Sequence, residues 1–62
     1  MKTSERLDRI AESLILAAAE LRRLDLPNGG ATAELVEYTE TLLRARIVRL
    51  RDEATILRRV ND

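Results

Sequence analysis

The sequence contains no cysteine and no histidine, and its 62 residues include a single aromatic side chain, Tyr38. Without cysteine there is no disulfide and no thiol chemistry, and without cysteine and histidine the commonest ligands of transition metals are missing. A chain with one aromatic residue also has no row of rings on which nucleic-acid bases could stack. We therefore expect no metal site, no cofactor and no catalytic residues, and we expect that the chain is not an enzyme.

Net charge and long apolar runs are absent as well. Eleven basic side chains balance eleven acidic ones, so the chain has no overall field that would draw it to nucleic acid or to an anionic membrane. The longest apolar run, from Leu14 to Ala19, is far too short to span a bilayer, and the N-terminus does not have the layout of a signal peptide. These observations predict a cytoplasmic chain that does not associate with membranes.

The chain is rich in apolar residues at helical spacing, most clearly over residues 32–60. One row recurs every seventh position and a second row lies three or four positions away, which is the a/d spacing of a packed helix seam. Beside this seam Leu35, Leu42 and Ile56 widen the apolar stripe beyond what one neighbouring helix covers. The predicted seam residues are Ala33, Val36, Leu43, Ile47, Leu50, Ala54 and Leu57.

A similar pattern predicts a first helix over residues 4–25. Ile15 and Leu16 lie outside its seam, and an apolar pair on the outer side of a helix indicates contact with a third helix or with a partner. Thr3 or Ser4 is the predicted N-cap of this helix, and Thr32 is that of the second helix. The predicted seam residues are Leu7, Ile10, Leu14, Ala17, Leu21 and Leu24, with Ala11 and Ala18 beside them.

Residues 26–31 interrupt both patterns. Pro27 cannot continue a helix interior, and Asn28 and Gly29 provide the positive φ angles that a tight reversal requires. The sequence therefore predicts a single all-α domain over residues 1–62, an antiparallel helical hairpin with its turn near Gly29. In such a hairpin the acids of the first helix, Asp8 among them, lie beside the arginines late in the second helix.

The unequal lengths of the two helices predict self-association. The first helix would cover the second only to about Asp52, so that Glu53 to Val60 would extend past it. Apolar side chains in that overhang lose about 1.5–3 kcal/mol each when they stay in water. We therefore predict a homodimeric four-helix bundle with coiled-coil packing. Its predicted interface and core residues are Ile15, Leu16, Leu43, Ile47, Leu50, Ile56 and Leu57.

Three charged side chains, Arg46, Arg49 and Glu53, interrupt the apolar face of the second helix. Arg49 and Glu53 have the i,i+4 spacing of an ion pair, which favours a partly buried pair or a bridge between subunits that sets their register. The alternative is a small-anion or carboxylate site, with the two guanidinium groups as clamps and Glu53 as a hydrogen-bonding or proton-transfer group.

The segment from Arg44 to Arg51 holds four arginines without an acid until Asp52, which leaves RNA binding as a further alternative. A helical-hairpin dimer of this size is similar in layout to the RNA-binding ROP architecture. These arginines are spread around the helix, however, so the sequence disfavours nucleic acid as a partner. The predicted function is a small non-enzymatic association module that homodimerises and acts as a protein-binding accessory or regulatory factor. The sequence does not name its protein partner.

Overall fold

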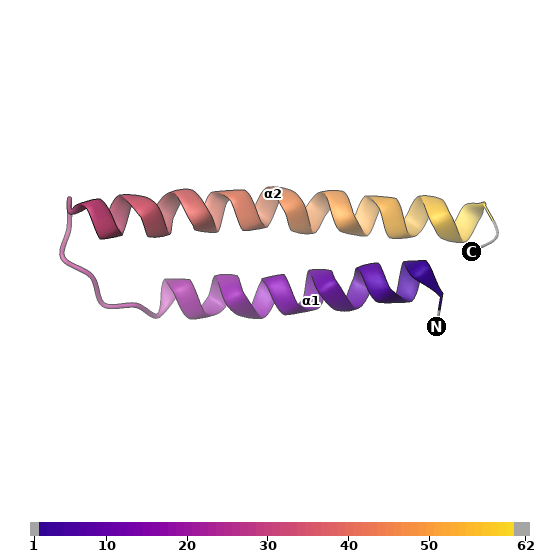
Figure 1. Cartoon of the computed structure of the whole chain (residues 1–62), viewed down its shortest axis with the longest axis horizontal. Coiled ribbons are helices and arrows are strands. Elements are labelled where there is room, and N and C mark those ends of the chain that lie inside the picture. The colour runs from indigo at the N-terminus through magenta and orange to yellow at the C-terminus, as the bar shows by residue number, and fades with distance from the viewer. Residues whose placement is uncertain (1, 61–62) are drawn as a thin grey trace.

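Two helices packed side by side make up the chain, as a computed structural model of residues 2–60 shows (Figure 1). Helix α1 spans Thr3–Arg22 and helix α2 spans Ala31–Arg59, and they run antiparallel. No strand occurs among these residues. The all-α helical hairpin predicted from the sequence is confirmed. The predicted domain also includes residues 1, 61 and 62, which lie outside the described part of the chain.

Both helices begin without the side-chain caps that the sequence predicted. The N-cap of α1 is Lys2 and that of α2 is Gly30, and neither end has a hydrogen bond from a capping side chain. Glu5 and Glu34 occupy the first turns, so negative charge near the positive end of each helix dipole stabilises these ends. The predicted caps lie inside the helices instead, and they are Thr3, Ser4 and Thr32.

The connection between the helices covers residues 23–30 and is longer than the predicted turn. Helix α1 ends at Arg22 rather than near residue 25. The backbone amides of Arg23 and Leu24 bond to carbonyls three residues back, which closes the helix with a tightened turn. Pro27 then keeps the residue before it out of the helical region. Gly29 has a φ of 77°, as the reversal was expected to require.

Most of the extra length of α2 lies at the end opposite to the one predicted. Arg22, the last residue of α1, pairs with Glu40, whereas Asp8 pairs with Arg58 close to the C-terminal end of α2. The turns of α2 before Glu40 therefore extend past α1, and the connection runs beside them (Figure 1). The predicted overhang after Asp52 is wrong, because the connection continues along the hairpin axis before the chain reverses.

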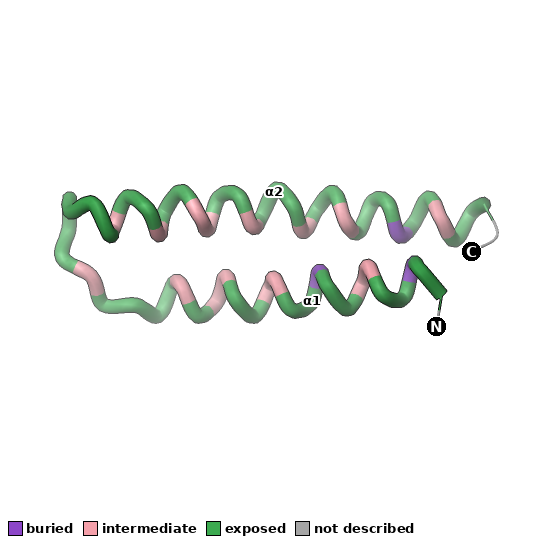
Figure 2. The backbone as a smooth tube through the Cα atoms, viewed as in Figure 1, coloured by how far each residue is buried: buried purple, intermediate pink, exposed green. Residues whose placement is uncertain are grey.

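The buried and half-buried residues lie on the sides of α1 and α2 that face each other (Figure 2). Within residues 2–60, the buried residues are Ala11 and Ala54, both without exposed surface, and Ser4, which is 1% exposed. The half-buried residues at a/d spacing are Leu7, Leu14, Ala18 and Leu21 in α1 and Ala33, Val36, Leu43, Ile47, Leu50 and Leu57 in α2. The predicted seam of α2 is therefore half-buried or buried throughout, although Ala33 and Val36 precede Glu40 and lie in the turns that extend past α1.

The seam of α1 differs from the prediction on one side. Its leucines alternate with the small residues Ser4, Ala11 and Ala18. Three residues that were expected in the seam are exposed: Ile10 and Ala17 in the helix, and Leu24 in the connection after it. The distance between two packed helices depends on the side chains at their contact, and small side chains allow a close approach. The row of small residues therefore faces α2, and Ile10 is left at the edge of the hairpin.

The hairpin is too thin to enclose its apolar surface. Its radius of gyration is 14.7 Å and its extents are 48 × 15 × 10 Å, whereas a compact domain of this length has a radius of gyration of about 11 Å. The accessible surface of the chain is 5069 Å², roughly 1,000 Å² more than a folded monomer of this mass exposes. Two helices by themselves thus leave an unusually large surface in contact with water.

Candidate interaction surface

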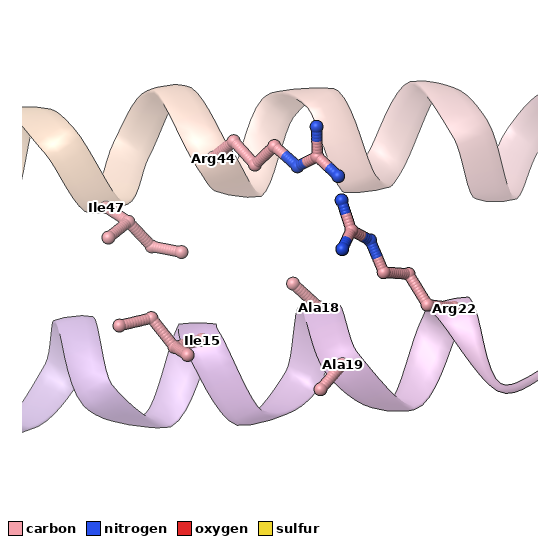
Figure 3. A pocket seen from close by; sticks show the side chains of 6 residues that line it. All are labelled: Ile15, Ala18, Ala19, Arg22, Arg44 and Ile47. Atoms are coloured by element: carbon pink, nitrogen blue, oxygen red, sulfur yellow. The ribbon is translucent and has the colours of Figure 1, made fainter.

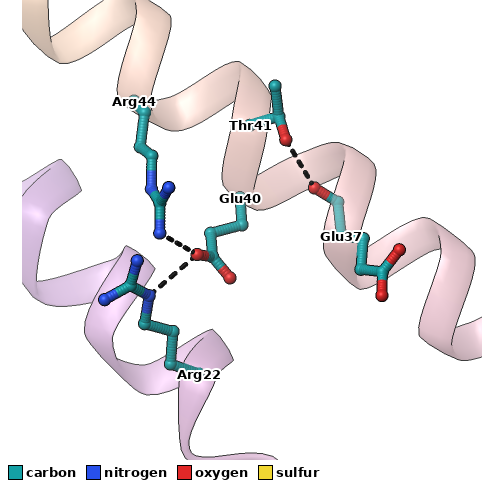
Figure 4. Close-up of polar contacts among 5 residues, drawn as sticks. All are labelled: Arg22, Glu37, Glu40, Thr41 and Arg44. Atoms are coloured by element: carbon teal, nitrogen blue, oxygen red, sulfur yellow. Dashed lines mark hydrogen bonds and ion pairs between the residues drawn. The ribbon is translucent and has the colours of Figure 1, made fainter. Parts of the chain in front are cut away.

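Ion pairs between the helices close one long edge of the hairpin. Arg58 donates a hydrogen bond to Asp8 near the N-terminal end of α1, and the Nε of Arg22 donates to Oε1 of Glu40 at 2.8 Å near its other end. Nη2 of Arg44 donates to the same oxygen at 2.5 Å (Figure 4). The Asp8–Arg58 pair confirms that acids of α1 meet arginines late in α2. We call these five residues the ion-paired edge.

The ion-paired edge determines alignment more than stability. The side chain of Glu40 is 19% exposed, but its partners Arg22 and Arg44 are 62% and 55% exposed. Water solvates guanidinium groups at such exposures, so each pair contributes less than about 1 kcal/mol. Pairs near both ends of α1 nevertheless favour one alignment of the helices over a shifted one. They also place charged groups near both ends of this edge.

Several hydroxyl groups are already used within the helices. In Figure 4 the hydroxyl of Thr41 donates to the carbonyl of Glu37 at 3.0 Å. Such bonds occupy the hydroxyl on its own helix, as is usual for serine and threonine in helix interiors. The hydroxyls that donate to the carbonyl four residues earlier are those of Ser13, Thr39, Thr41 and Thr55.

A shallow depression of about 270 Å³ lies between the helices on the ion-paired edge (Figure 3). Ile15 and Ile47 form its apolar wall, and the guanidinium groups of Arg22 and Arg44 lie at one end. The sequence predicted that Ile15 points away from the seam, but the side chain lines the contact with α2. Small side chains beside Ile15 allow α2 to pack closely on this side of α1, and Ile15 therefore lies at the contact instead of pointing away from it. The remaining residues of the wall are Ala18 and Ala19.

The opposite long edge of the hairpin is apolar. A residue two positions further along a helix lies about 200° around it, so Ile10, which follows Asp8, faces away from the ion pairs. Leu42 follows Glu40 in the same way. The large apolar side chains exposed on this side are 45–71% exposed. We call the surface formed by Ile10, Ala17, Leu35, Leu42, Ile56 and Val60 the apolar edge.

The structure distributes the predicted interface residues over different surfaces. Ile15 and Ile47 meet at the depression on the ion-paired edge. Ile56 is 49% exposed on the apolar edge, and Leu16 is 65% exposed on the outer side of α1. The remaining three, which are half-buried between the helices, are Leu43, Leu50 and Leu57.

Arg46, Arg49 and Glu53 are exposed beside the apolar edge. Arg46 follows Arg44 by two residues and therefore lies on the side of α2 away from the ion pairs. None of the four ion pairs found within residues 2–60 includes any of these three side chains. The i,i+4 pair of Arg49 and Glu53 is thus not formed within the hairpin. The alternative, a bridge between subunits, stays a prediction.

Sequence reasoning predicted Ala54 in the contact but underestimated two residues of α1: it treated Ser4 as a possible cap and placed Ala11 only beside the seam, whereas both are buried. Ser4, Ala11 and Ala18 recur at intervals of seven residues. A row of small residues at this spacing is a signal for a close helix contact, but it is weak beside a row of large apolar residues. Because Ile10 has a larger apolar side chain than Ala11, the prediction placed the seam on the side of the leucines that carries Ile10, and this side is wrong.

No protein-family model, curated protein or solved structure matches this chain. Within residues 2–60, no group of three or more histidine, cysteine, aspartate or glutamate side chains could hold a metal ion. Neither helix contains a stretch that is apolar and long enough to cross a bilayer. The function of the chain is therefore inferred from its two contrasting edges.

Proposed function

We propose that this chain is a small, non-enzymatic helical association module that homodimerises and acts by binding protein. The observation that supports this proposal best is the contrast between the edges of the hairpin. One edge is closed by charged pairs, while the other exposes Leu42, Ile56 and further large apolar side chains. Small monomeric proteins seldom expose many large apolar side chains along one edge, and such a surface commonly marks a protein interface.

The size of the uncovered surface supports the same proposal. The chain exposes roughly 1,000 Å² more than a folded monomer of its mass, and each partner in a standard protein interface buries about 800 Å². One partner bound along the apolar edge would therefore cover most of the excess. It would also complete the burial of the leucines that are half-buried between α1 and α2.

The accessory or regulatory part of the proposed function belongs to the outer faces of the dimer. Leu16 and Val48 are 65% and 58% exposed and lie outside the apolar edge, whereas Tyr38, which precedes Ile56 by five full helical turns, lies on that edge. Large aliphatic side chains on an exposed helix face can pack against a helix or groove of another protein. Dimerisation would present two copies of Leu16 and Val48 to such a protein.

Sedimentation equilibrium over a concentration series tests the homodimer, with helicity followed on the same samples by circular dichroism. We expect a dimer whose helix content falls as it dissociates. Leu42→Glu places a charge on the apolar edge at a side chain that is 45% exposed, and should yield a monomer. Val48→Glu is the matched control, since Val48 is 58% exposed on the other flank of α2. A wild-type chain that stays a fully helical monomer at every concentration would contradict the proposal.

RNA binding, the first alternative from the sequence, has less support. Arg44 and Arg58 are engaged in ion pairs on one edge, while Arg46 lies beside the other edge. Arg44 and Arg58 form a row with Arg51 at intervals of seven residues, but the pairing of two of these three with Glu40 and Asp8 weakens their attraction to a phosphate backbone. Filter binding to mixed RNA at low and high salt tests this alternative, because electrostatic binding falls steeply with salt.

For the small-anion alternative, the guanidinium groups that lie together in the hairpin are not those of Arg46 and Arg49, which the sequence predicted. Arg22 and Arg44 lie at one end of the depression, but they share Oε1 of Glu40, which already balances one of their two charges. An anion would have to compete with this carboxylate. Thermal denaturation with and without succinate tests the alternative, because a ligand of the folded state raises the midpoint.

A further inference from the structure

We infer that the apolar edge binds a second copy of this chain, with the two α2 helices antiparallel about a two-fold axis that passes between Arg49 and Leu50. This inference rests on the proposed function and adds to it the partner, its orientation and the register. The charges that interrupt the apolar edge, together with their spacing along α2, lead to this arrangement.

Arg46 and Glu53 lie at equal distances on either side of the proposed axis. Antiparallel pairing therefore places Arg46 opposite Glu53 of the partner subunit, and the two-fold symmetry repeats the contact in the other direction. Neither side chain takes part in an ion pair within the described hairpin. Arg46 and Glu53 thus each find an opposite charge that the described hairpin does not supply.

The apolar residues match in the same register. Leu42 and Leu57 are equally distant from the axis, and so are Leu43 and Ile56. Leu42 and Ile56 are 45% and 49% exposed in the hairpin, whereas Leu43 and Leu57 are half-buried. Each exposed side chain consequently meets a half-buried leucine of the other copy. Apolar surface is removed from water on both sides, which is the main source of affinity at such a contact.

Other arrangements of the same two helices bring like charges together. A parallel pair places Arg46 beside Arg46 of the partner subunit and Glu53 beside Glu53 of the partner subunit. An antiparallel pair shifted by seven residues places either Arg46 opposite Arg46 of the partner subunit or Glu53 opposite Glu53 of the partner subunit, depending on the direction of the shift. Like charges held close together at an interface are unfavourable. The charge pattern therefore selects one register among those that the heptad spacing allows.

Arg49 lies next to the proposed axis. It precedes Glu53 by one helical turn, so in the dimer the carboxylate of Glu53 has its own Arg49 on one side and Arg46 of the partner subunit on the other. The long aliphatic stem of Arg49 covers apolar surface near the axis while its guanidinium group stays in water. Arg49 thus adds surface coverage near the axis, and the register depends on Arg46 and Glu53.

Two charge reversals and their mixture test the register by sedimentation equilibrium. Arg46→Glu alone sets two acids against each other twice in the dimer, and Glu53→Arg alone does the same with two bases. We expect each variant to raise the dimer dissociation constant roughly tenfold or more. An equimolar mixture of the two variants restores both opposite-charge contacts in the heterodimer. We therefore expect the mixture to associate about as tightly as the wild type.

The matched control reverses Asp52 and Arg59, which are also seven residues apart on α2 but lie on its outer side. Asp52→Arg, Arg59→Glu and their mixture should all associate like the wild type. Helicity measured on each sample shows whether a variant still folds. If the wild type dimerises but the Arg46→Glu and Glu53→Arg mixture is no tighter than the separate variants, the register is wrong while the proposed function stands. A wild-type chain that does not associate overturns both.

Discussion

Replacing Ala11 by leucine tests the close contact between the helices most directly. Ala11 has no exposed surface and belongs to the row of small residues that faces α2. A leucine there adds three carbon atoms where no space is open to solvent, so α2 must move away or the new side chain must adopt a strained rotamer. Overpacking of this kind costs roughly 1–3 kcal/mol.

The expected loss is large relative to the total stability of the chain. A domain of 62 residues has a free energy of unfolding of roughly 3–9 kcal/mol, and each kcal/mol lost lowers the melting midpoint by about 4–8 °C in a domain of this size. We expect Ala11→Leu to lower the midpoint by at least about 4 °C in thermal denaturation followed by circular dichroism at fixed protein concentration.

Ala45→Leu provides the matched control for this experiment. Ala45 is exposed on the outer side of α2, and the substitution makes the same change in side-chain volume and nearly the same change in helix propensity. Its midpoint should stay close to that of the wild type. If Ala11→Leu and Ala45→Leu melt at the same temperature, the helices do not approach each other at Ala11 as closely as described, and the reasoning about the small-residue row fails.

Two further predictions concern the turn and the ion-paired edge. Gly29 has a φ of 77° and open space where a Cβ would lie, so Gly29→Ala should lower the unfolding free energy by about 1 kcal/mol through backbone strain alone. Gly30 has the same open space and no positive φ, so Gly30→Ala should be neutral or stabilising. A denaturant titration measures both variants. Glu40→Gln removes the charge shared by two arginines and should lower the unfolding free energy by about 0.5–1 kcal/mol, with a smaller loss at high salt, whereas Glu37→Gln should show no measurable change in either buffer. Equal effects of the two glutamine variants would mean that the pairs at Glu40 contribute nothing to folding.

The sequence was sufficient to predict the helices and their arrangement in a hairpin. Apolar residues at intervals of three and four form a helical seam in any context, and Pro27 and Gly29 interrupt helices through their own backbone geometry. The residues predicted for the seam of α2, from Ala33 to Leu57, are all half-buried or buried, because they form the row that recurs most regularly at intervals of three and four residues. The pairing of acids in α1 with arginines late in α2 followed from the chain direction alone, and the Asp8–Arg58 pair confirms it.

The path of the connection depended on tertiary structure. The residues from Pro27 to Gly30 indicate where the chain reverses, but local sequence does not indicate how far it travels along the axis before doing so. Because the connection runs onward beyond Arg22, the uncovered turns of α2 precede Glu40, and the predicted overhang after Asp52 is paired instead. The helices begin at Thr3 and Ala31, and neither start has the hydroxyl cap that the sequence predicted.

The sequence by itself determined that this protein forms two amphipathic helices joined by one turn, because periodicity and turn chemistry are local properties. Only the tertiary structure decided which part of each wide apolar stripe lies inside the hairpin. A stripe broader than one helix contact can pack in more than one rotation, and local spacing does not distinguish them. Close approach at Ala11 and Ala54 favoured the small-residue side of α1. That rotation placed Ile15 beside Ile47 on the ion-paired edge and left Ile10 and Leu42 exposed together on the apolar edge.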